Sequence, residues 1–163
     1  MRHLIAAVAA TSAVLATAAT VLAGGPGEVA YPEGYRSWTH VKSMVIQDGH
    51  PLAGSFAGIH HLYANAPAME GYTSGTFPDG AVIVFDLLEA NATGDKALVE
   101  GARKVVGVME RGAEKYATTG GWGFEGFKGD SQELVVGDKA VEACYGCHEA
   151  QKAKGYLFSA YRP

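Results

Sequence analysis

The feature that most constrains this chain is a pentapeptide near its C-terminal end, Cys144-Tyr145-Gly146-Cys147-His148. It reads Cys-x-x-Cys-His, a spacing at which both thiols can form thioethers to the vinyl groups of one porphyrin. The imidazole that follows the second cysteine can then serve as an axial ligand of the iron. Both cysteines of the chain are in this segment. We therefore predict one covalent haem c per chain, attached at Cys144 and Cys147, with His148 as the metal ligand.

Three other uses of a Cys-x-x-Cys pair compete with haem attachment. A thioredoxin-like dithiol is expected at a helix start within a βαβ unit, whereas this pair lies near the end of the chain. A tetrahedral zinc site needs about two more Cys or His ligands at close spacing, and none lie nearby. A structural disulfide stays open in an exported protein. The adjacent histidine, together with an export signal, favours haem.

That export signal is the pattern of residues 1–23. Arg2 and His3 give a positive start, and Leu4 to Leu22 is a run of Ala, Val and Leu broken only by Thr and Ser. Small residues at Val21-Leu22-Ala23 predict a signal peptide cleaved after Ala23. An uncleaved anchor is the alternative, because this run is just long enough to span a membrane. Haem is attached to exported c-type proteins outside the cytoplasm, so we expect a periplasmic protein.

The remainder of the chain, residues 24–163, is expected to form one domain. Its 140 residues suffice for a real core, and no repeat or second domain is apparent. Without the leader it carries 12 Lys and Arg against 17 Asp and Glu, a net charge of −5. This charge gives no basic patch for nucleic acid or anionic lipid. We therefore expect neither nucleic acid nor, after cleavage, membrane as a partner.

Short strand patterns joined by turns predict an α+β fold dominated by an antiparallel sheet. Short helical pieces are expected around residues 32–38, 66–72 and 113–117, and Phe77-Pro78-Asp79-Gly80 and Asn91–Asp95 as turns. Asp138 is the expected N-cap of a helix that runs through Lys154 and carries the haem motif. The five expected strands are Val41–Gln47, Phe56–Ala64, Ala81–Leu88, Val105–Glu110 and Trp122–Lys128.

Alternation along these strands groups the residues that could face the haem. In the second strand it places Phe56, His60 and Leu62, with Gly58, on one face, and His61 on the other. In the third strand Phe85 shares a face with Ala81, Ile83 and Leu87. On the C-terminal helix, Val141, Cys144 and His148 are expected on one face.

Four segments together carry a family resemblance: Tyr31 to Trp38, Gly75 to Val84, Gly121-Trp-Gly-Phe124, and the Cys-x-x-Cys-His motif with its helix. From about Tyr31 to its end, the chain resembles the cytochrome P-460 and cytochrome c′-beta family. The resemblance implies an exported haem-c protein with a mostly antiparallel β fold and a five-coordinate iron. It also implies a homodimer.

Within this family, the P-460 branch has a lysine cross-linked to the porphyrin at the end of the Phe-Pro-Asp-Gly strand, and its members oxidise hydroxylamine. The matching residue here is Phe85, which cannot form that bond, and neither Lys42 nor Lys96 is at the matching position. The chain thus resembles the c′-beta branch, in which phenylalanines crowd the distal side and the haem binds nitric oxide and carbon monoxide.

The residue chemistry points the same way. Nitric oxide and carbon monoxide bind ferrous haem without a hydrogen-bond donor, whereas bound dioxygen gains from distal donors. If Phe85 and Phe56 covered the distal side of the haem, they would favour nitric oxide and carbon monoxide, although core packing is the ordinary role of such rings. His60 could be a sixth ligand, a proton donor to a bound ligand, or a surface histidine at the sheet edge. Met44, Met69 and Met109 are conceivable ligands but more often core residues.

Three functions therefore stay open from the sequence. The first is a gas-binding haem protein, a nitric oxide sink or carrier. The second is a P-460-type enzyme that oxidises hydroxylamine or nitric oxide, so whether the protein is an enzyme is undecided. The third is an electron-transfer cytochrome with a sixth protein ligand and a redox partner protein.

Overall fold

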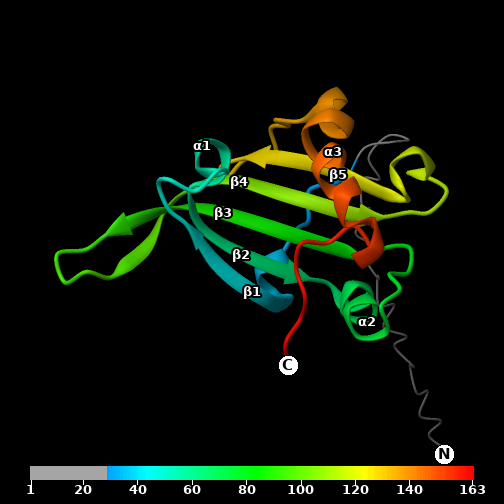
Figure 1. Cartoon of the computed structure of the whole chain (residues 1–163), viewed down its shortest axis with the longest axis horizontal. Helices are drawn as coiled ribbons and strands as arrows, with labels where there is room; N and C mark the ends of the chain where they lie inside the picture. The colour runs from blue at the N-terminus through cyan, green and yellow to red at the C-terminus, as the bar shows by residue number, and fades with distance from the viewer. Residues whose placement is uncertain (1–28) are drawn as a thin grey trace, which may run out of the picture.

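The computed structural model describes residues 29–163, and the expected signal peptide lies outside them. Within this range five strands form one antiparallel sheet in the order β1-β2-β3-β4-β5, so each strand pairs with the next along the chain (Figure 1). The predicted α+β class is confirmed. The strands are β1 (Thr39–Ile46), β2 (Gly58–Ala64), β3 (Val82–Ala92), β4 (Leu98–Arg111) and β5 (Trp122–Lys128).

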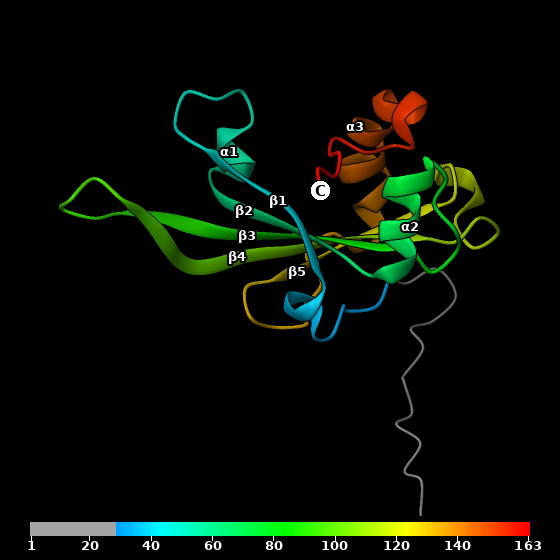
Figure 2. The ribbon, with the colours of Figure 1, turned by 90° about the horizontal axis from the view of Figure 1, so that it is seen from below.

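Both faces of the sheet are covered, as Figure 2 shows. Helices α1 (Ala53–Phe56) and α2 (Ala66–Ser74) lie on one face with the C-terminal helical segment, which includes α3 (Gly146–His148). The N-terminal segment, with a helical turn at Tyr35–Ser37, lies on the other. Because successive strand residues point to opposite faces, β3 contributes Ile83 to the first core and Val84 to the second. We call the face that carries α1, α2 and the C-terminal helical segment the haem face, and the face that carries the N-terminal segment the back face.

The C-terminal helical segment runs from Gly137 to Lys154 and is irregular. It contains a turn at Gly137–Lys139, a π-helical stretch at Val141–Tyr145, then α3, and finally Glu149–Lys154. A π-turn is wider than an α-turn, so the expected shared face of Val141, Cys144 and His148 does not hold. Val141 is 56 % exposed, whereas Cys144 and His148 are half-buried.

Two further expectations about local structure were wrong. Asp138 is not the N-cap, because it lies inside the first turn, and within residues 29–163 no side-chain cap bond is found there. Phe56 is not on a strand; it ends α1, and β2 begins only at Gly58. Gly58 has φ +138°, and a Cβ there would lie 2.1 Å from the Leu88 carbonyl oxygen. The chain can turn into the sheet at this point only with glycine.

The β3–β4 hairpin is longer than predicted. Asn91 and Ala92 still belong to β3, and the turn is formed by Thr93 to Ala97. Figure 1 shows the outer part of this hairpin projecting beyond the other strands. Apart from the exposed Leu98 and Val99, its residues are polar or small, so apolar alternation gave no signal. Backbone pairing between Asn91 and Val99 and between Ala92 and Leu98 extends the ladder there.

The back face is fixed by a buried carboxylate. Asp86 of β3 is fully buried and accepts hydrogen bonds from Arg36 Nε and Arg103 Nε, each at 2.8 Å. Arg36 comes from the N-terminal segment, so this double ion pair ties that segment to β3 and β4. Burial and the nearby Asp86 charge raise the pKa of the Tyr35 hydroxyl, which therefore stays protonated. Among the described residues, no helix is both long and apolar enough to span a membrane.

Candidate haem-binding site

The two cysteines of the motif lie on successive turns of the C-terminal segment as free thiols. Cys144 is half-buried and Cys147 is exposed. Burial, with a smaller contribution from the Glu125 carboxylate, raises the pKa of the Cys144 thiol to about 11. Redox-active Cys-x-x-Cys dithiols have a lowered thiol pKa. The environment of Cys144 therefore argues against a thioredoxin-like role.

His148 is held in the orientation that a metal ligand requires. Its Nδ1 donates to the Tyr156 carbonyl oxygen at 2.7 Å, because a carbonyl can only accept. This fixes the tautomer and leaves Nε2 with its lone pair available, a common arrangement of ligating histidines. Rings of Phe124 and Phe158 pack against the imidazole, each with a centroid distance of 5.0 Å. Burial lowers the pKa of His148, which favours the neutral, ligating form.

The Tyr156 carbonyl was not foreseen from the sequence. The helical segment ends at Gly155 in the left-handed conformation, with φ +68°. Tyr156 also has a positive φ, so the chain turns sharply back toward His148. Gly155 is a recognisable stop signal, but nothing in the sequence indicates which carbonyl the turn presents to the imidazole.

The start of the helical segment is held by Glu125 of β5, another residue that sequence reasoning missed. Its side chain is buried, and Oε1 accepts hydrogen bonds from the backbone amides of Val136 and Gly137 at 3.1 Å. Glu125 therefore caps the start of the helical segment, the role that was expected of Asp138. A carboxylate from a distant strand satisfies the amides at a helix start as well as a local cap does.

Phe56, His60 and Phe85 lie together on the haem face. The rings of Phe56 and Phe85 meet edge to face at 5.8 Å, and those of His60 and Phe85 at 4.7 Å. Phe56 reaches this cluster from α1 and is 37 % exposed. His60 is 1 % exposed and lies on β2, inside the sheet order, so it is not a surface histidine at the edge.

The ring nitrogens of His60 are in unequal environments. Nε2 donates to the Phe56 carbonyl oxygen at 2.5 Å, so Nδ1 is the unprotonated nitrogen of a neutral ring. Within residues 29–163, this buried Nδ1 has no hydrogen-bond partner. Burial lowers the pKa of His60, which keeps the ring neutral. His61 projects to the back face, as expected, and bonds Ser43 and Glu100 there.

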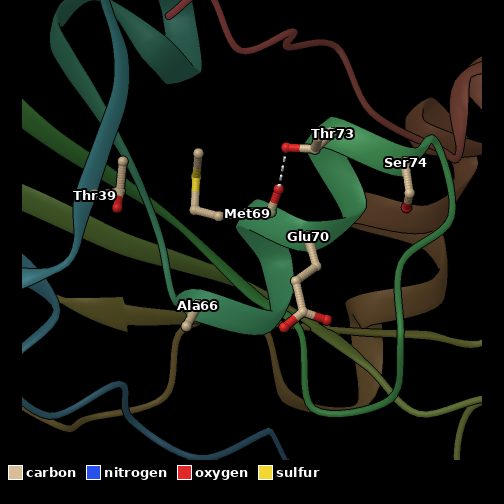
Figure 3. Close-up of a pocket in the computed structure, with 6 residues that line it drawn as sticks. All are labelled: Thr39, Ala66, Met69, Glu70, Thr73 and Ser74. Atoms are coloured by element: carbon tan, nitrogen blue, oxygen red, sulfur yellow. Dashed lines mark hydrogen bonds between the residues drawn. The ribbon is translucent and has the colours of Figure 1, made fainter.

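The other candidate ligands lie apart from this cluster or in packed surroundings. Met109 is buried in the core of the haem face, and Met44 is 41 % exposed on the edge strand β1. Met69 points from α2 toward β1 into an open depression of about 630 Å³ (Figure 3). That depression is lined by Thr39, Ala66, Met69, Glu70, Thr73 and Ser74. It contains none of the motif residues, so we do not assign it as the haem site.

The residues around the motif fit a porphyrin. The motif provides every group that haem c attachment needs: two free thiols at the right spacing and an imidazole whose Nε2 is available. Large apolar side chains stand exposed on this face of the sheet: Phe158, which packs on His148, by 61 %, and Phe56 of α1 by 37 %. Exposed apolar surface of this kind marks a ligand site. Cys144, Cys147 and His148 are the residues that would hold the group, and Phe56, His60 and Phe85 lie on the same face of the sheet (Figure 2).

A mostly antiparallel β protein whose C-terminal helical segment carries Cys-x-x-Cys-His over one sheet face is a haem-binding cytochrome of the c type. The family model for cytochrome P460 matches residues 32–159. The chain therefore belongs to the cytochrome P460 family, as the sequence resemblance predicted. A search of curated proteins finds no match.

Proposed function

We propose that this cytochrome binds small neutral gases, nitric oxide and carbon monoxide, and serves as a nitric oxide sink or carrier. The observation that carries the proposal is the apolar character of the cluster of Phe56, Phe85 and His60. Its only N–H group, on His60 Nε2, is already donated to the Phe56 carbonyl. A bound haem c would supply an iron at which a diatomic ligand coordinates. The cluster therefore offers no free N–H to a bound ligand that carries negative charge, which disfavours dioxygen and peroxide.

We also propose that the haem is covalent, one per chain, and that the iron is five-coordinate with His148 as its protein ligand. Residues 1–23 support export to the periplasm. The resemblance to the c′-beta branch supports a homodimer. Phe85 at the cross-linking position supports that branch over the hydroxylamine-oxidising one.

Absorption spectra of the ferric and ferrous protein, before and after nitric oxide or carbon monoxide, test the proposal. We expect a high-spin ferric form and a ferrous form that takes up both gases. A red-shifted ferrous Soret band of the P-460 kind would instead indicate a cross-linked, enzymatic haem. A low-spin spectrum indifferent to carbon monoxide would indicate a sixth protein ligand and electron transfer.

Replacing Phe85 with valine should speed carbon monoxide binding to the ferrous protein. The smaller side chain removes the ring that Phe56 and His60 pack against. Lowering the entry barrier by about 1.4 kcal/mol would raise the association rate about tenfold. Flash photolysis measures that rate. Phe127→Val, on the back face, is the matched control and should leave it unchanged. Equal rates in the Phe85 variant and the native protein would mean that Phe85 is only a core residue.

A further inference from the structure

Two side chains donate hydrogen bonds to consecutive backbone carbonyls at the point where α1 joins β2. His60 Nε2 donates to the Phe56 carbonyl at 2.5 Å, and Lys104 Nζ donates to the Ala57 carbonyl at 2.8 Å. These two carbonyls lie at the C-terminal end of α1, where helix carbonyls have no partner within the helix. The bonds come from two different strands, β2 and β4, so they tie α1 to the sheet.

Lys104 reaches α1 because β4 is irregular at this residue. Val105 pairs with Leu87 and Arg103 pairs with Leu88, so Lys104 is an extra residue between two successive pairs. Such a bulge re-aims the side chain of the extra residue. Arg103 points to the back face, where it binds Asp86, while Lys104 is released toward α1. The bulge therefore allows Arg103 to bind Asp86 on the back face while Lys104 reaches α1.

The segment that these bonds hold belongs to the connection between β1 and β2, whose two ends meet where Ile46 pairs with Gly58. At its C-terminal end, Gly58 packs directly on the Leu88 backbone and leaves no room for a side chain. At its other end, Gln47 to Leu52 form an exposed loop. Its backbone bonds there are local, from His50 to Gln47 and from Ala53 to His50. Phe56 is the residue that α1 contributes to the cluster with Phe85 and His60, and the His60 and Lys104 bonds tie the backbone at this residue and the next to the sheet.

We propose that Lys104 and His60 are positioning residues that hold Phe56 closed over Phe85 and so set how fast a small ligand reaches the site. The inference rests on the proposed gas binding. His60 acts here through the Phe56 backbone, and its only ring N–H is committed to that bond. Because Nε2 bonds the Phe56 carbonyl and the ring is buried, Nδ1 has no hydrogen-bond partner among the described residues.

The test compares Lys104→Met with Lys128→Met in the holoprotein. Methionine keeps most of the side-chain length but cannot donate to the Ala57 carbonyl. Lys128 is a suitable control because it lies on the neighbouring strand, where its ammonium group pairs with Glu133 instead. We expect Lys104→Met to raise the carbon monoxide association rate about tenfold, which corresponds to about 1.4 kcal/mol. Lys128→Met should leave the rate unchanged, and Lys104→Arg, which keeps a donor, should remain close to the native rate.

His60 is tested by a pair of variants. His60→Leu removes the donor and should speed carbon monoxide entry, whereas His60→Gln keeps an N–H and should largely preserve the native rate. A merely structural role would not distinguish the two in this way, because both fill the buried space. If leucine and glutamine act alike, His60 is not a tether.

Hydrogen exchange separates failure of this inference from failure of the proposed function. Faster exchange of the amides of residues 53–57 in Lys104→Met and His60→Leu would show that the tether holds α1, whether or not gas binds. Native exchange and native rates in both variants would overturn the inference. Faster exchange with an unchanged association rate would also overturn it, since α1 would then not control entry. A native protein that takes up no gas would refute the proposed function, and exchange would still decide the tether.

Discussion

Replacing His148 with alanine is expected to remove the residue that we propose as the protein ligand of the iron, while the proposed thioether bonds keep the haem on the chain. Cys144 and Cys147 stay in place, so both thioether positions are preserved. The imidazole that Tyr156 orients through Nδ1 is lost. We expect a changed Soret band in both redox states and altered binding of carbon monoxide. Denaturing gels stained for haem should still show the cofactor attached, because attachment depends on the thiols.

Added imidazole provides the decisive control for this variant. Free imidazole can occupy the space left by the side chain and should return the spectrum toward that of the native protein. His61→Ala is the matched control, because His61 lies on the back face and bonds Ser43 and Glu100. Its spectrum should be native. An unaltered spectrum in His148→Ala would refute the ligand assignment.

Replacing Asp86 with alanine should cause the largest loss of stability of any change considered. The substitution removes the carboxylate that Arg36 and Arg103 share. The two arginines then keep only their more exposed partners, Glu100 and Asp130 respectively. Breaking a buried ion pair by removing one partner costs several kcal/mol. Because the Arg36 side chain is 41 % exposed and can recover water, we expect about 3 kcal/mol, the low end of that range. Urea unfolding of the holoprotein, followed by far-UV circular dichroism, measures this loss.

Two further variants make the Asp86 result interpretable. Asp86→Asn keeps the shape and can still accept a hydrogen bond, so it should lose less stability than alanine. Asp95→Ala removes an exposed carboxylate in the turn of the projecting hairpin, and its unfolding midpoint should be native. If all three variants unfold alike, the Asp86 ion pairs are not what fastens the N-terminal segment to the back face.

The parts of this structure that were predictable are those governed by local pattern. Alternating apolar residues identified the sheet, and the face of β3 that carries Phe85 was assigned correctly from parity alone. Phe56 was misplaced because Gly58 was treated as an ordinary strand residue. In fact β2 begins at Gly58, whose positive φ turns the chain away from the direction of the strand. The contact between Phe56 and Phe85 exists nevertheless, through α1.

The residues that could not be predicted act over long distances in the chain. Glu125 holds the start of the helical segment from a strand, and Lys104 reaches α1 across 47 residues of sequence. Their roles depend on a bulge and on the order of strands. The residues next to a lysine or a glutamate in the sequence indicate neither a bulge nor the order of the strands. The same holds for Tyr156, whose backbone carbonyl, not its side chain, contacts the imidazole.

The order of the strands also has a kinetic consequence. Because each strand pairs with the one before it, every pairing closes a short loop and little chain entropy is lost at each step. The haem-binding segment follows the last strand, so the sheet can assemble from residues already available while that segment is still free. The covalent attachment proposed above would then take place on a sheet that has already formed, and the folding of the sheet would not depend on it.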